Sequence, residues 1–250
     1  MEHRILAFET LTSTSDYLKE NLSSLEDGAV VVTSFQSKGR GRKGRSWESS
    51  SGDLIFSLLL QDVPSNSFSV LPLLSGVALS LALEDHDVRP SIKWPNDLYF
   101  HTKKIAGILC EGVSEGGRQS AIIGIGVNLA PREFSKDIAL KAESLGNLGH
   151  PIQKEELLPN FLNHFDALWN SSLLGKADWF PLLKNRDFLK NQRVHLNYYG
   201  ENLRGTAKGI APSGALLVEK EDGQIIQVTS GEATLSPSSD NNIEKEFTHA

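Results

Sequence analysis

A basic, glycine-rich run near the start of the chain combines residue types that hold anions. Residues 39–47 read Gly-Arg-Gly-Arg-Lys-Gly-Arg-Ser-Trp, so that four cationic side chains alternate with three glycines. Glycine lets a backbone adopt positive φ and approach a ligand, and arginine supplies a planar, permanently charged fork for phosphate or carboxylate. The run predicts an anion-binding loop, although a solvated basic loop without a ligand would have the same composition.

The spacing of Gly39, Gly41 and Gly44 also matches the dinucleotide-binding fingerprint. That fingerprint needs a strand before it and a helix after it, because the pyrophosphate binds at the helix N-terminus. Residues 29–35 predict the strand, but residues 52–60 are a short apolar run typical of another strand. The Rossmann interpretation fails, and a protein-kinase loop is excluded because the V-A-I-K, H-R-D and D-F-G elements are absent.

A second run of residues that could bind a ligand or take part in catalysis lies at residues 93–109. It contains Lys-Trp-Pro-Asn-Asp over residues 93–97 and Lys-Ile-Ala-Gly-Ile-Leu over residues 104–109. Each part alone has an ordinary explanation, because lysines often end exposed strands and Asn-Asp after proline favours a turn. Asn128, at the end of an apolar strand predicted over residues 120–129, can likewise bond to local backbone or face a ligand.

Small hydroxyl side chains gather in residues 9–16, just before an amphipathic run that predicts a helix. One serine or threonine suffices to cap a helix N-terminus, and this segment contains five. The surplus donors and acceptors fit a neutral polar ligand group. Capping and ligand binding remain equally open from these residues alone.

The composition predicts a globular cytoplasmic protein, long enough for one large domain or for one with a small companion. The chain has 250 residues, 39% of them hydrophobic, a single cysteine (Cys110), a net charge of −6 and a pI near 5.7. One cysteine excludes an intramolecular disulfide framework, the N-terminus lacks a signal peptide, and the longest apolar segment falls short of a membrane span. The acidic balance disfavours general nucleic-acid binding, which depends on phosphate neutralisation.

The hydrophobic pattern predicts the elements that position these residues. Strands are expected over residues 4–8 and 54–60 as well as those above, and a hairpin is expected to turn at His101-Thr102. Helices are expected over residues 70–83, 157–169 and about 179–189, where Pro159 implies a late start or a kink in the second. Residues 131–149 have weak periodicity and predict a long mobile segment.

The pattern changes near residue 190. Short alternating strands separated by glycine turns predict a small antiparallel barrel over residues 190–235, after a larger domain over residues 1–189. Residues 236–250 are polar and predict a disordered tail.

These motifs together resemble the biotin–protein ligases. The resemblance rests on the hydroxyl cluster, the glycine–arginine loop, the Lys-Trp-Pro-Asn-Asp stretch and the sequence Gly-Ile-Gly-Val-Asn-Leu over residues 124–129, and it covers about residues 8–235. It implies an α/β (α+β) fold, with a mixed-sheet catalytic domain of the biotin/lipoate ligase type followed by a small SH3-like β-barrel. It implies a ligase reaction in which biotin and ATP, with Mg²⁺, give biotinoyl-5′-AMP and pyrophosphate. The biotinoyl group then passes to a lysine of a biotin carboxyl carrier protein, for example the carrier domain of acetyl-CoA carboxylase.

The resemblance also implies a role for individual residues. Lys104, preferred to Lys103 because it lies three residues before Gly107 as in the motif, is expected to touch both the biotin carboxylate and the phosphate. The expected catalytic residues are Lys104, Arg40 and Arg42. The expected biotin contacts are Ser13, Thr14, Ser15, Gln36, Gly39, Arg40, Gly41, Arg42, Lys104 and Gly107. The expected nucleotide contacts are Arg42, Arg45, Trp47, Asn96, Asp97, Lys104 and Asn128.

Two features of the chain differ from some relatives. Many family members carry asparagine where this chain has Ser15, which shortens that hydrogen-bonding group. The first predicted strand begins at Arg4, so the chain resembles the monofunctional type without an N-terminal DNA-binding domain, and no DNA binding is expected. Magnesium is expected mainly on the phosphates, with at most Asp97 from the protein and no separate metal site. Monomer and homodimer remain open.

Two other functions compete with this interpretation. A lipoate or octanoate ligase or transferase has a related fold, but the arginine-rich loop, the Lys-Trp-Pro-Asn-Asp stretch and the C-terminal barrel favour biotin. A non-catalytic nucleotide- or RNA-binding module could also use the basic loop. The acidic net charge and the lack of aromatic residues between the arginines disfavour that module.

Overall fold

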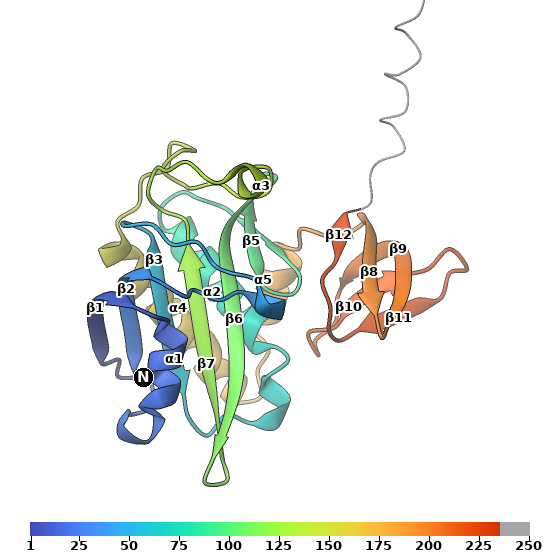
Figure 1. The fold of residues 1–250 in the computed structure, drawn as a ribbon. Helices are drawn as coiled ribbons and strands as arrows, with labels where there is room; N and C mark the ends of the chain where they lie inside the picture. The colour runs from blue at the N-terminus through green and yellow to red at the C-terminus, as the bar shows by residue number, and fades with distance from the viewer. Residues whose placement is uncertain (236–250) are drawn as a thin grey trace, which may run out of the picture.

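A computed structural model describes residues 1–235, which form a seven-stranded sheet and a five-stranded sheet beside it (Figure 1). The order of the larger sheet is β1-β2-β3-β7-β6-β5-β4. Its strands are β1 (Ile5–Leu11), β2 (Val30–Gln36), β3 (Leu54–Leu60), β4 (Ser91–Lys93), β5 (Asp97–Phe100), β6 (Lys103–Glu115) and β7 (Arg118–Val127). Only the β1–β2 pair is parallel, so the sheet is mixed, as predicted.

The centre of this sheet follows directly from the apolar runs of the sequence. Every residue of β3 is buried, which explains why that run does not alternate between apolar and polar residues. The hairpin predicted at His101-Thr102 is confirmed, because β5 and β6 pair on either side of it. Long strands β6 and β7 then form a second hairpin that extends beyond the rest of the sheet (Figure 1).

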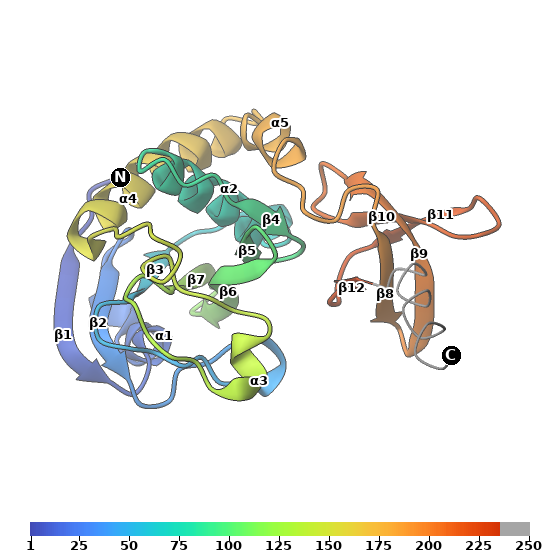
Figure 2. The same ribbon diagram turned by 90° about the horizontal axis from the view of Figure 1, so that it is seen from above.

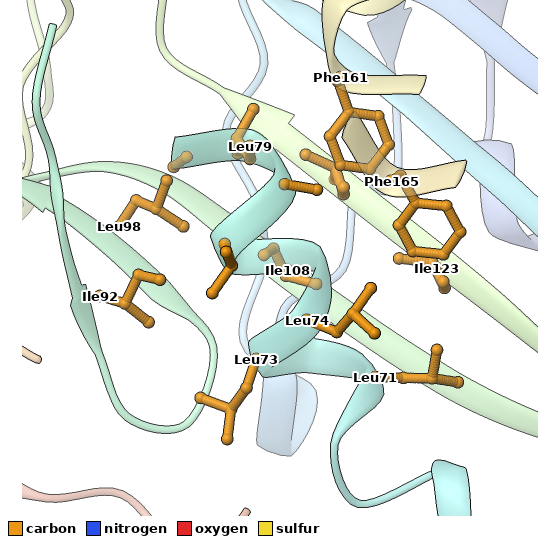
Figure 3. Packing of buried hydrophobic residues seen from close by; sticks show 14 of the residues in the cluster. Leu71, Leu73, Leu74, Leu79, Ile92, Leu98, Ile108, Ile123, Phe161 and Phe165 are labelled. Atoms are coloured by element: carbon orange, nitrogen blue, oxygen red, sulfur yellow. The ribbon is translucent and has the colours of Figure 1, made fainter. Parts of the chain in front are cut away.

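Helices cover both faces of the sheet (Figure 2). On one face lie α2 (Leu71–Glu84) and α4 (Lys154–Leu173), with α5 (Trp179–Lys184) beside them, and on the other lies α1 (Thr14–Glu20). Helix α2 is apolar nearly all round because it lies between the sheet and α4. Figure 3 shows its leucines between Ile108 and Ile123 of the sheet and Phe161 and Phe165 of α4.

Two helix boundaries differ from the expectation. A late start of α4 is wrong, because the helix begins at Lys154 and continues through Pro159. Proline there removes a single backbone donor, while Leu157, Leu158 and Phe161 are buried around it. Helix α5 ends at Lys184, earlier than predicted, because the chain then leaves the helix to pair with β4, where the Phe188 N–H donates to the Ile92 carbonyl at 3.0 Å.

The segment over residues 131–149 is folded against the sheet instead of extending freely. It contains one short helix, α3 (Lys136–Ala139), and forms a bridge between Ala142 and Lys104. Asn147 ties its two ends together, because its side chain donates to the Arg132 carbonyl at 2.7 Å and accepts from the Arg132 N–H at 3.2 Å. We call residues 131–147 the cover segment.

The antiparallel sheet predicted for the C-terminal strands is confirmed. Its sheet has the order β11-β10-β9-β8-β12, with strands β8 (Arg193–Tyr198), β9 (Glu201–Ile210), β10 (Leu216–Glu219), β11 (Ile225–Val228) and β12 (Thr234–Leu235). The indole N–H of buried Trp94 donates to the Gly214 carbonyl at 2.9 Å and so joins this sheet to the larger one. The tail predicted to be disordered, residues 236–250, lies outside the described residues.

Short 3₁₀ turns complete the described structure. They lie at Leu22–Ser24, at Arg42–Gly44 within the basic loop, and at Ser65–Ser67 before α2. No helix within residues 1–235 is long and apolar enough to cross a membrane.

Candidate active site

A pocket of about 370 Å³ brings the four sequence motifs together. Its walls come from the start of α1, the ends of β2, β3, β6 and β7, the basic loop and the cover segment. The predicted site residues that line it are Ser13, Thr14, Ser15, Gln36, Arg40, Gly41, Arg42, Arg45, Trp47, Asn96, Asp97, Lys104, Gly107 and Asn128. Gly39 is the one predicted contact that does not line it, and a Cβ there would lie 2.6 Å from the Trp47 carbonyl oxygen.

One end of the pocket is a buried, neutral hydrogen-bond network. Gln36 Oε1 accepts from the backbone N–H of Thr14 at 2.8 Å and from its hydroxyl at 3.1 Å. Ser57 Oγ lies 2.7 Å from Thr14 Oγ1 and 2.9 Å from Ser15 Oγ. Ser13 caps α1 by accepting from the Asp16 N–H, so capping explains one hydroxyl of the five.

The donors in this network can be assigned, because each hydroxyl carries a single hydrogen. The Thr14 hydroxyl donates to Gln36, so Ser57 must donate to Thr14 and Ser15 must donate to Ser57. Within this arrangement Ser15 Oγ still has acceptor capacity, and Gln36 Nε2 and the Ser13 hydroxyl can donate. This end of the pocket therefore offers both donors and acceptors and no net charge.

The middle of the pocket holds the lysine of the second motif. Lys104 Nζ forms an ion pair of 2.7 Å with Asp97 Oδ1 and lies 5.5 Å from the centre of the Trp47 ring. Lys103, its neighbour, donates instead to the carbonyls of Ala139 and Leu140 at 2.7 and 3.1 Å, outside the pocket. The alternation of strand β6 separates the two lysines.

Glycines leave the space that Trp47 occupies beside the sheet. A Cβ on Gly126 would lie 2.4 Å from Trp47 Cε2, and a Cβ on Gly107 would lie 3.0 Å from Trp47 Cζ3. The indole thus rests against strand backbone of β6 and β7. Its Nε1 is buried and has no hydrogen-bond partner among residues 1–235.

Each arginine of the basic loop is held by an acceptor of the chain itself. Arg40 pairs with Asp16 at 2.6 Å and with Glu111 at 3.3 Å. Arg42 donates to Asn96 Oδ1 at 3.2 Å and to the Gly231 carbonyl at 3.1 Å, and Arg45 forms an ion pair with Glu232. The anion-binding loop predicted from sequence is therefore folded over the pocket by carboxylates and carbonyls.

The far end of the pocket centres on Asn128 and Arg132. Asn128 donates to the Glu143 carbonyl at 3.2 Å, and its Oδ1 accepts from Arg132 at 2.7 Å. Arg132 also pairs at 2.9 Å with Asp53, which is fully buried. Burial raises the pKa of Asp53, and the Arg132 guanidinium and three backbone N–H donors oppose that rise.

Comparison with known proteins was made against this geometry. The family model "Biotin/lipoate A/B protein ligase family" matches residues 7–128, and the model "Biotin protein ligase C terminal domain" matches residues 191–236. A "Biotin--[acetyl-CoA-carboxylase] ligase" of Paracoccus denitrificans is 33% identical over 80% of this chain and 88% of its own length. The "Bifunctional ligase/repressor BirA" of Bacillus subtilis is 31% identical over 89% of this chain and 71% of its own length.

A solved structure has the same fold over nearly the whole chain. The biotin protein ligase from Aquifex aeolicus in complex with biotin and ATP superposes with a TM-score of 0.83 and 30% identity, covering 93% of this chain and 98% of that one. This chain belongs to the biotin protein ligase family.

The pocket-lining or supporting residues that escaped the sequence analysis include Ser57, Asp53, Arg132 and Phe134. Arg132 and Phe134 line the pocket, with the Arg132 guanidinium 4.2 Å from the centre of the Phe134 ring. Ser57 and Asp53 lie behind its wall and are both fully buried. The one available signal was a serine and an aspartate within or beside a strand that is otherwise apolar.

Proposed function

We propose that this protein is an ATP-dependent biotin ligase that makes biotinoyl-5′-AMP in the pocket and then transfers the biotinoyl group to a lysine of a biotin carboxyl carrier protein. In the first step a biotin carboxylate oxygen bonds to the α-phosphorus of ATP and pyrophosphate leaves. In the second step the lysine amine attacks the biotinoyl carbonyl and AMP leaves. The observation that carries the proposal is a single pocket with a neutral hydrogen-bonding end and a cationic middle.

The neutral end suits the ureido ring of biotin. That ring presents one carbonyl acceptor, to which the Ser13 hydroxyl and the Gln36 amide can donate, and two N–H donors, one of which Ser15 Oγ can accept. A site built to hydrogen-bond a polar ligand group discriminates strongly against analogues that lack that group. Ser15 can fill the role that asparagine fills in many relatives. Its hydroxyl hydrogen is donated to Ser57, so its oxygen remains able to accept a hydrogen bond from the ligand.

The cationic middle suits the reacting atoms. A carboxylate that approaches the α-phosphate brings two anions together, and fixed cations lower the energy of that encounter. Lys104 is the central group, and Arg40 and Arg42 of the basic loop line the same pocket. The ligand anions would take over contacts that Asp97, Asp16 and Glu111 make with these cations.

The nucleotide would extend toward Trp47, Asn96 and Asn128. The buried indole N–H of Trp47 lacks a protein partner among the described residues, and such groups in native proteins usually meet a ligand or water. ATP would enter as its magnesium complex, with the metal on the phosphates. No cluster of three or more His, Cys, Asp or Glu side chains suited to a metal occurs within residues 1–235.

The proposed reaction also assigns roles to the two parts of the chain, a protein partner and a location. We assign catalysis to residues 1–189 and a supporting role to residues 190–235, which contact the basic loop through Gly231 and Glu232. The partner would be the carrier domain of a biotin-dependent carboxylase, and the location would be the cytoplasm, where ATP and a reduced Cys110 occur together. A lipoate or octanoate ligase is not favoured, because a C-terminal biotin ligase domain is present.

The deciding experiment is transfer of biotin to a purified carrier domain with ATP and magnesium. Mass spectrometry should show one added biotinoyl group per carrier, and none when ATP is omitted or when octanoate replaces biotin. Transfer of octanoate without transfer of biotin would overturn the proposal in favour of the lipoate branch.

A further inference from the structure

The guanidinium of Arg132 joins four separate parts of the nucleotide end. It pairs with Asp53 at the start of β3, donates to Asn128 at the end of β7, and lies 3.4 Å from the Glu48 carbonyl, just after Trp47. It also stacks on Phe134 in its own segment at 4.2 Å. The Arg132 side chain is 11% exposed, so these contacts form in a largely dry environment.

Asp53 is built to hold this arginine in place. It is fully buried, its Oδ1 accepts from the N–H groups of Leu129 and Ala130 at 3.0 and 3.3 Å, and its Oδ2 accepts from the Ser50 N–H at 3.0 Å. A carboxylate with three fixed donors has little freedom to move. It therefore presents its charge to Arg132 from a position set by strands β3 and β7.

The cover segment is attached to the sheet through the same arginine. Its first residues are tied by Arg132 to Asp53, its ends are joined by Asn147, and its last part lies beside Lys104, whose N–H donates to the Lys141 carbonyl at 2.8 Å. Movement of Arg132 would therefore shift Asn128 and the cover segment together.

We propose that the Asp53–Arg132 pair is a positioning device for the nucleotide half of the reaction, which orients Asn128 and holds the cover segment over ATP and biotinoyl-AMP. Both are positioning residues, since Asp53 acts through Arg132 and Arg132 acts through Asn128 and the segment. This inference rests on the proposed biotin ligase function. It assigns the pair to the nucleotide and not to biotin, because the neutral end of the pocket has its own network around Ser57.

The test compares Asp53→Asn, Arg132→Lys and the wild type. Biotin binding is followed by calorimetry, the KM for ATP by pyrophosphate release, and escape of biotinoyl-AMP by its appearance in free solution. Asp53→Asn removes the charge and keeps one oxygen that can accept from the Leu129 and Ala130 N–H groups, whereas Arg132→Lys keeps the charge and removes the fork. We expect each to raise the KM for ATP or the escape rate about tenfold to a hundredfold, with biotin affinity within about twofold of wild type.

Glu84→Gln is the matched control. Glu84 forms a partly buried pair with Arg186, at 2.7 and 2.9 Å, and neither residue lines the pocket, so its loss tests the effect of breaking such a pair on the fold alone. All variants are assayed below their melting temperatures, and Arg132→Lys decides the question if Asp53→Asn does not fold. Wild-type kinetics in both variants, or equal losses in biotin and ATP binding, would overturn the inference. Failure of the wild type to make biotinoyl-AMP would overturn the proposed function instead.

Discussion

The two ends of the pocket are built from different kinds of structure. The neutral end is a network of buried hydroxyls on α1 and β3, closed by an amide on β2. The cationic middle and far end combine a strand lysine with arginines from loops, and these cations are held by carboxylates such as Asp97, Asp16 and Glu232. A neutral ring can be bound by groups fixed in the core, whereas charged ligands are met by cations that remain solvated or paired until the ligand arrives.

This difference predicts that a substitution at one end of the pocket should weaken the binding of one substrate without weakening the binding of the other. A change in the core network should weaken biotin binding and leave the nucleotide contacts intact. A change around Trp47 or the basic loop should do the opposite. The following substitutions test that separation, in order of expected effect.

Gly126→Ala should have the largest effect on the nucleotide end. The added Cβ would lie 2.4 Å from Trp47 Cε2, so the indole must leave its position beside β7. We expect the KM for ATP to rise about a hundredfold, since misplacement by about 1 Å can cost that much, with a much smaller loss in biotin affinity. Steady-state kinetics and calorimetry give the two values.

Gly76→Ala is the control for that substitution. A Cβ at Gly76, in α2, would meet its nearest neighbour at 3.6 Å, an ordinary contact distance. It should leave both affinities unchanged. Equal effects from the two alanines would show that the change at Gly126 acts through general packing.

Ser57→Ala should affect the biotin end selectively. The variant removes the hydroxyl that links Thr14 and Ser15, and leaving buried polar partners unsatisfied costs about 1–3 kcal/mol. Biotin affinity should therefore fall about tenfold or more, while the KM for ATP stays constant. Ser75→Ala serves as the control, because Ser75 is also fully buried but its hydroxyl has no hydrogen-bond partner in the described part of the chain. An unchanged biotin affinity in Ser57→Ala would contradict the assignment of this end.

Glu232→Gln should have the smallest effect. It removes the partner of Arg45, but both side chains are partly exposed, so solvent already screens the pair. We expect the KM for ATP to change about two- to fivefold, less at high salt, with the carrier-transfer step measured in parallel. Glu221→Gln, which removes the exposed partner of Arg193 on the same sheet, should change nothing. A loss as large as that of Gly126→Ala would mean that the C-terminal domain holds the loop far more tightly than this geometry implies.

The sequence predicted most of the fold because its patterns are local. The apolar run of β3, the turn at His101-Thr102 and the short strands after residue 190 each carry their own signal. The errors arose where tertiary contacts override local preference. Burial around Pro159 lets α4 begin at Lys154, and pairing with β4 ends α5 early.

The residues of the site also divide into those that a local sequence pattern predicted and those that only the folded chain brings together. The predicted site residues were found because they stand in unusual runs, and all but Gly39 line the pocket. Ser57 was missed because it lies in an apolar strand and looks like a core residue. Asp53 and Arg132 were missed because each has an ordinary local explanation, and only the folded chain brings them to 2.9 Å. The mobility expected for residues 131–149 remains a prediction, to be tested by proteolysis with and without biotin and ATP.

Lys104 is where the two ends meet, so it offers the most direct test. The measurement is biotin-dependent exchange of labelled pyrophosphate into ATP, in the wild type and in Lys104→Met. We predict exchange in the wild type only when biotin is present, and a rate about a hundredfold to a thousandfold lower in the variant, the usual cost of losing one fixed charge-stabilising group. Exchange without biotin, or equal rates in both proteins, would contradict the account.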